Sequence, residues 1–61
     1  METSLKENVE RLIATYRNRN KSNKYFLAGY IIDLNFEKAN KTQIQIDALE
    51  LVIIDLEYLL K

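Results

Sequence analysis

Five apolar residues in the C-terminal third of this sequence follow an alternating spacing of three and four, which limits the possible folds more than any other feature. They are Ile46, Leu49, Ile53, Leu56 and Leu60. Such spacing places side chains on one stripe of an α-helix that packs against another helix. We therefore predict a helix over residues 43–60 with this stripe buried.

The same helix has more apolar residues than one neighbouring helix can cover. The additional residues are Ala48, Val52 and Leu59 beside the stripe, and Leu51, Ile54 and Tyr58 in a further patch. A helix that is apolar over more than half of its surface needs cover on more than one side. We expect this helix to contact at least two neighbours.

Two other helices are predicted upstream. Ser4 and Glu7 have the spacing of a capping box, and helical periodicity then predicts a helix over residues 4–18. Its buried stripe is expected to consist of Leu5, Val9, Leu12, Ile13 and Tyr16. The next helix, over residues 23–39, has apolar residues on two faces. It contains the single glycine, Gly29, which we expect to permit the close approach of a neighbouring helix.

Two polar segments are predicted to separate these helices. Residues 18–23 contain no apolar residue, and their Asn and Ser side chains favour turns, which indicates a loop. Asn40 is of a type that often ends a helix, so a tight turn is predicted at residues 40–42. The alternative is one unbroken helix over residues 23–60.

These elements predict an all-α fold with a single domain over residues 1–61. Its first helix would complete a small three-helix bundle with the hairpin of the second and third helices. Chains of about 60 residues without disulfides or metals are marginally stable and often associate. We therefore expect the bundle to be completed by dimerisation, and a monomeric bundle is the alternative. The candidate self-association residues are Ile46, Leu49, Val52, Ile53, Leu56, Leu59 and Leu60.

Catalytic chemistry has little support in this composition. The chain has no Cys and no His, so it lacks a thiolate nucleophile and the commonest general base and metal ligand. Its neighbouring carboxylates, such as Asp47 and Glu50, follow a helix strip expected to face solvent, whereas acid–base catalysis needs two carboxyl groups in one pocket. We predict no enzymatic activity, no cofactor and no metal.

Residues 42–47 are Thr42-Gln43-Ile44-Gln45-Ile46-Asp47. This stretch is similar to the motif Ser-Gln-x-Leu-Asp that the small helical-hairpin aspartyl phosphatases of the sporulation phosphorelay have on a helix. Thr replaces Ser and Asp is one residue further along, so the chain is not assigned to that family. A phosphatase-like activity is the third interpretation of the sequence.

Charge is balanced overall but unevenly distributed. The formal net charge is zero, yet five basic residues and no acidic residue lie between Arg11 and Ile32. Basic residues mixed with aromatic ones can bind phosphates and stack on bases, or contact an acidic protein surface. The candidate partner-binding residues are Arg17, Arg19, Lys21, Lys24, Tyr25, Phe26 and Tyr30.

Taken together, these features predict a small helical interaction protein or regulator that self-associates and binds or occludes a partner protein. The alternative is a nucleic-acid-binding regulator that uses the basic loop over residues 17–24. The longest apolar run has eight residues, whereas a membrane span needs about 20; we expect a cytoplasmic protein without membrane contact. Phe, Tyr, Met, Ile, Asn and Lys fill 26 of 61 positions, which favours an AT-rich genome, such as that of a phage or mobile element.

Overall fold

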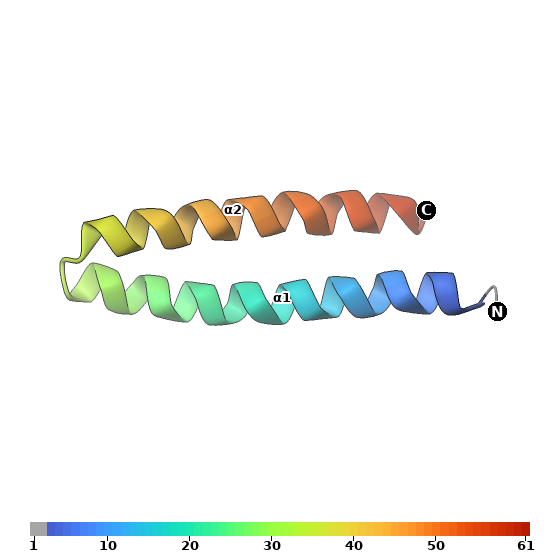
Figure 1. The fold of residues 1–61 in the computed structure, drawn as a ribbon, viewed down its shortest axis with the longest axis horizontal. Helices are drawn as coiled ribbons and strands as arrows, with labels where there is room; N and C mark the ends of the chain where they lie inside the picture. The colour runs from blue at the N-terminus through green and yellow to red at the C-terminus, as the bar shows by residue number, and fades with distance from the viewer. Residues whose placement is uncertain (1–2) are drawn as a thin grey trace.

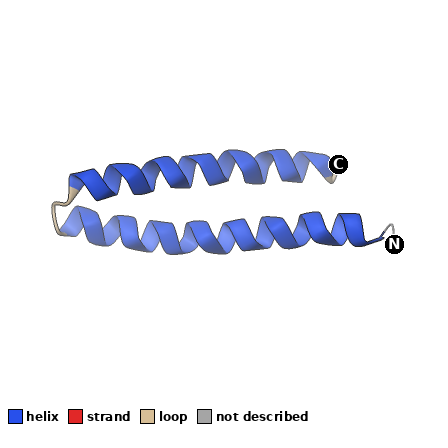
Figure 2. Ribbon diagram, in the orientation of Figure 1, coloured by secondary structure: helices blue, strands red, loops and turns tan. Residues whose placement is uncertain are grey.

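The computed structural model describes residues 3–61, which form a hairpin of two antiparallel α-helices (Figure 1). Helix α1 spans Thr3–Ile32 and helix α2 spans Phe36–Leu59. Figure 2 shows helix on both arms and a short loop between them. The start of α1 and the end of α2 lie together at what we call the open end of the hairpin (Figure 1). Met1 and Glu2, which the predicted domain includes, lie outside the described residues.

The all-helical prediction is confirmed for residues 3–61, but the arrangement has two helices and one interface instead of the predicted three-helix bundle. The predicted helices over 4–18 and 23–39 are parts of one helix up to Ile32, and the predicted loop over 18–23 lies inside it. Asn20 explains why, because its side chain is only 4% exposed and its Nδ2 donates to the Ile46 carbonyl at 3.0 Å. An amide bonded across the interface does not compete with the backbone hydrogen bonds of its own helix.

The chain reverses direction at residues 33–35, and not at the predicted residues 40–42, which lie inside α2. Leu34 has a φ of 60°, in the left-handed region. Asn35 caps α2, since its Oδ1 accepts from the Lys38 N–H at 3.3 Å, and its own N–H donates to the Tyr30 carbonyl at 2.8 Å. Asn35 therefore contributes a capping hydrogen bond to each of the two helix ends at this turn. The predicted helix over 43–60 starts earlier, at Phe36, and the alternative of one helix over 23–60 is wrong.

The two helices meet along a seam with heptad spacing. The fully buried apolar residues are Ile13 on α1 and Ala39, Ile46 and Ile53 on α2. Between them lie half-buried residues, namely Val9, Tyr16, Asn23, Leu27 and Tyr30 on α1 and Thr42, Leu49 and Leu56 on α2. Alternating steps of three and four residues on both helices are typical of coiled-coil packing. The stripe predicted on the C-terminal helix is thus the surface that α1 covers.

A single neighbour leaves several predicted core residues in solvent. Leu5 is 72% exposed and Leu12 is 43% exposed, although both were expected in the buried stripe of the first helix. One helix covers only a narrow band of another, and both side chains lie at the edge of that band or beyond it. Gly29 does not permit a close helix approach either, because a Cβ built there meets no atom within 4 Å.

The left-handed backbone at Leu34 gives a first prediction. Leu34→Gly is expected to be more stable than Leu34→Ala by about 1 kcal/mol, because only glycine adopts positive φ without steric cost. Leu34 is largely exposed, so both variants lose little packing. The free energy of unfolding from urea titration measures the difference.

Gly29 supplies the opposite control. It lies inside α1 with open space around its Cα, so Gly29→Ala should stabilise the hairpin by about 1 kcal/mol. If alanine proved more stable than glycine at both positions, the left-handed turn at Leu34 would be contradicted.

Candidate interaction surfaces

The face of α2 that points away from α1 has a second apolar stripe, which we call the outer stripe. It consists of Ile44, Ala48, Leu51, Asp55 and Tyr58. The steps between these residues are again four and three, and at 100° per residue the stripe lies nearly opposite Ile46 and Ile53. Ile44, Leu51 and Tyr58 are 63%, 64% and 75% exposed. Helix α2 therefore presents helix-packing patterns on two opposite sides, and α1 covers one of them.

Carboxylates accompany the outer stripe. Residues 42–60 contain Asp47, Glu50, Asp55 and Glu57 and no Lys or Arg. Glu57 pairs with the Arg17 guanidinium of α1. Asp47 accepts a hydrogen bond from Gln43 Nε2 at 2.9 Å, and Asp55 forms no ion pair with any residue of the described chain. The outer face of α2 is thus apolar and acidic.

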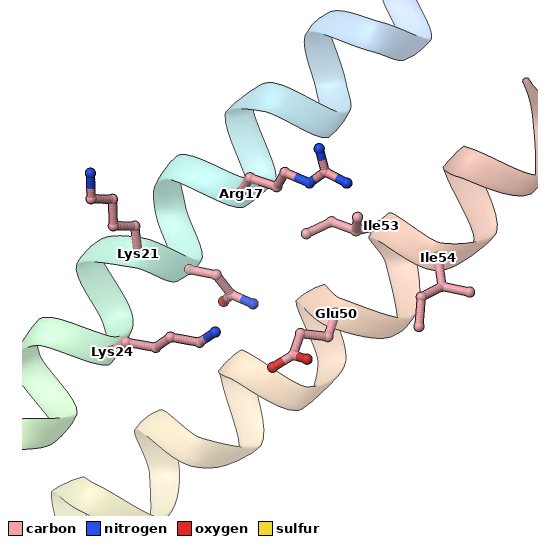
Figure 3. Close-up of a pocket in the computed structure, with 7 residues that line it drawn as sticks. Arg17, Lys21, Lys24, Glu50, Ile53 and Ile54 are labelled. Carbon is pink, nitrogen blue, oxygen red and sulfur yellow. The ribbon is translucent and has the colours of Figure 1, made fainter.

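A groove along one flank of the hairpin combines basic and acidic side chains (Figure 3). Arg17, Lys21 and Lys24 line it from α1, at steps of four and three residues, and Glu50 and Ile54 line it from α2. In Figure 3 the Lys24 ammonium and the Glu50 carboxylate point toward each other across the groove. The positive charge of α1 therefore faces negative charge within the same molecule.

The predicted partner-binding residues do not form one patch. They belong to helix α1 and not to a loop. Successive side chains of a helix point in different directions around its axis, so these residues lie on different faces of α1. Arg19 lines a groove with Gln45 and Leu49 on the opposite flank from Lys21 and Lys24.

Several of these predicted residues also have contacts inside the hairpin. The Arg19 guanidinium lies 5.7 Å from the centre of the Tyr16 ring, and the Lys38 ammonium lies 5.8 Å from that of Tyr30. The rings of Tyr25 and Phe26 meet edge to face, and both side chains are exposed. Of the predicted set, Tyr30 is half-buried, and the other six residues are exposed.

The predicted self-association residues divide into two groups. Ile46 and Ile53 are buried and Leu49 and Leu56 are half-buried, all against α1. Val52, Leu59 and Leu60 remain exposed. Their accessible surface continues onto α1 at the open end, where one apolar groove is lined by Leu5, Lys6, Val9, Leu59 and Leu60.

Four exposed apolar residues toward the open end of the hairpin form what we call the open-end patch, namely Leu5, Leu12, Val52 and Leu59. Leu12 lies seven residues before Arg19, and Val52 lies seven residues after Gln45. Because Arg19 and Gln45 line one groove, a step of two helical turns keeps Leu12 and Val52 on that same flank. The patch therefore extends across both helices.

Sequence reasoning did not single out the outer stripe as a site. Its signal was present, because Ile44, Leu51 and Tyr58 are each seven residues apart. Spacing alone does not indicate which of two apolar stripes with the same repeat is covered. In the structure α1 covers one stripe and leaves the other exposed.

The described residues contain neither a cluster of metal ligands nor a membrane-spanning helix. No three His, Cys, Asp or Glu side chains between residues 3 and 61 lie together as metal ligands would. Neither α1 nor α2 is both long enough and apolar enough to cross a membrane. Comparisons with protein families, with curated protein sequences and with solved structures find no match to this chain. The surfaces described above are therefore the candidate functional sites of the described residues.

Proposed function

We propose that this protein is a helical-hairpin interaction module that self-associates and binds a partner protein. One observation carries the proposal. Residues 3–61 fully bury only four apolar side chains, whereas fifteen large apolar side chains are exposed. Exposed apolar surface of this extent usually marks an interface. The module would act by bridging or occluding its partner, without a catalytic step.

The open-end patch is the proposed self-interface. Its four residues come from both helices, so a second hairpin placed on it would cover α1 and α2 together. The simplest closed arrangement is a two-fold dimer, in which the same patch meets itself. Burying a leucine side chain contributes about 1.5–3 kcal/mol, so a few such contacts would add substantially to a small hairpin. Val52 and Leu59 belong to the set proposed from the sequence.

Sedimentation equilibrium with circular dichroism tests the proposal. We expect a dimer whose melting temperature rises with protein concentration. Leu59→Asp should raise the dimer dissociation constant at least about tenfold, because a buried leucine contact is lost. Ile44→Asp is the matched control, since Ile44 is similarly exposed but lies on the outer stripe, and it should leave the dimer intact. A monomer at all concentrations would contradict self-association.

The nucleic-acid reading has no comparable support. Arg17 is paired with Glu57, and Lys21 and Lys24 share their groove with Glu50. A phosphate backbone approaching this flank would meet those carboxylates as well as the cations. A cytoplasmic location and an origin in a phage or mobile element remain predictions from the sequence.

A further inference from the structure

We propose that the outer stripe binds an amphipathic helix of a partner protein, with Lys or Arg beside its apolar face and one basic residue opposite Asp55. This inference deepens the proposed function, because it assigns a surface and a partner chemistry to the module. It depends on the spacing of the outer stripe, on its charge and on the poorer match of a second copy.

The spacing indicates a helix as the occupant. Steps of four and three residues from Ile44 to Tyr58 present knobs and holes to another helix, as the covered side of α2 does to α1. Ala48 lies between Ile44 and Leu51 and leaves room for a larger side chain of the partner. The stripe covers about four helical turns, at about 3.6 residues per turn. A partner helix of about 15 to 20 residues would match that length.

The charges indicate a basic partner. No Lys or Arg occurs in residues 42–60, and the cations of α1 pair with Glu57 and face Glu50, which both lie near the covered side of α2. Asp47 and Asp55 therefore remain without an ion pair among the described residues. A partner helix placed on the stripe would remove water from Asp55, which lies within the stripe itself. Burying a carboxylate without a cation is costly, so a Lys or Arg opposite Asp55 is required.

A second copy of this chain matches the stripe less well than a basic partner helix. Two α2 helices packed face to face would bury Asp55 of both copies, and the nearest cation of the stripe, Lys41, already pairs with Glu37. The outward face of α1 offers the polar and exposed residues Arg11, Thr15, Asn18 and Ser22, and its exposed apolar residues, Tyr25 and Ile32, lie only near the turn. Four successive polar positions match an apolar stripe poorly. The occupant is therefore a different protein, and the open-end patch stays available for self-association.

Binding of designed helical peptides to the full chain tests the inference. One fluorescent peptide has leucines at heptad positions, Lys on both flanks and one Lys at the level of Asp55. A second peptide has the same leucines with Glu in place of every Lys. Fluorescence anisotropy should show at least about tenfold tighter binding of the basic peptide, because close charge pairs at interfaces contribute strongly to affinity. Equal affinities, or no binding of either peptide, would overturn the inference.

Variants locate the binding site. Leu51→Ser should weaken binding of the basic peptide at least about tenfold, and Asp55→Asn by about tenfold. Tyr25→Ser is the matched control, because Tyr25 is an exposed apolar residue on α1. The affinity of this variant for the basic peptide should equal that of the natural chain. Loss of binding in Tyr25→Ser with retention in Leu51→Ser would overturn the assignment and place the site on α1. Sedimentation of the same samples reports self-association separately, so either proposal can fail without the other.

Discussion

Replacing Ile46 by alanine is expected to unfold much of the hairpin. Ile46 is 2% exposed and is the largest fully buried side chain among the described residues. Truncating a buried isoleucine to alanine costs about 2–5 kcal/mol. A chain of this size has a total stability of only about 3–9 kcal/mol, at about 0.05–0.15 kcal/mol per residue. Urea titration followed by circular dichroism should show a much lower midpoint, with substantial unfolding before urea is added.

Ile44→Ala is the matched control for Ile46→Ala. The two isoleucines are two residues apart on α2, but Ile44 is 63% exposed on the outer stripe. Its truncation should change the free energy of unfolding by less than about 0.5 kcal/mol, as is usual for surface substitutions. Similar losses at both positions would mean that α1 does not pack on the Ile46 side of α2, which would reject the seam.

Replacing Asn20 by aspartate is expected to destabilise the hairpin by about 1–3 kcal/mol, because it buries a carboxylate that can no longer donate to the Ile46 carbonyl. The Asn20 Nδ2 donates to the Ile46 carbonyl at 3.0 Å. An ionised carboxylate has no donor and would place its negative charge against that carbonyl oxygen. The free energy of unfolding of Asn20→Asp at neutral pH measures the loss.

Asn18→Asp is the control for Asn20→Asp, because Asn18 lies on the same helix but is exposed. It should remain within about 0.5 kcal/mol of the natural chain. Asn20→Leu tests whether the charge introduced by aspartate, and not simply a substitution at this position, destabilises the hairpin. Leucine removes the donor and the acceptor of Asn20 and fills the seam, while the half-buried Asn23 Nδ2 loses its acceptor, so this variant should be less destabilised than Asn20→Asp. If Asn20→Asp were as stable as Asn18→Asp, the burial of Asn20 against Ile46 would be contradicted.

Asn20→Leu also bears on register. A single buried Asn within a heptad seam selects one pairing of helices at some cost in stability. Asn20 donates to the Ile46 carbonyl and accepts from Asn23 Nδ2 at 3.3 Å, so both its donor and its acceptor are used in the observed alignment of α1 and α2. Without it, the apolar stripes of α2 become more nearly equivalent partners for α1.

The helical class and one seam could be predicted from the sequence, because both depend on local periodicity. Helical repeats, and steps of three and four residues between Ile46 and Leu56, follow from the geometry of any α-helix. The number of helices could not be predicted in the same way. The seam on α1 becomes visible only when Asn20 and Asn23 are counted among its members, and local preferences place both in a loop.

The position of the turn likewise depended on long-range packing. Asn40 and Asn35 are of the same residue type, and each can cap or end a helix. A turn at Asn35 lets both helices run long enough to align their seams, so that Ile13 and Ile53 are both buried within one interface. The residue type at position 40 does not indicate how much apolar surface a turn at Asn35 allows the two helices to bury.

Local periodicity is enough to make this chain helical and α2 apolar on two opposite sides, because periodicity is a property of consecutive residues. Which of the two sides is covered depends on packing between distant residues. The turn at residues 33–35 and the bond from Asn20 to the Ile46 carbonyl bring α1 onto one stripe. They leave the stripe containing Asp55 in solvent, where its charge and spacing define the proposed partner.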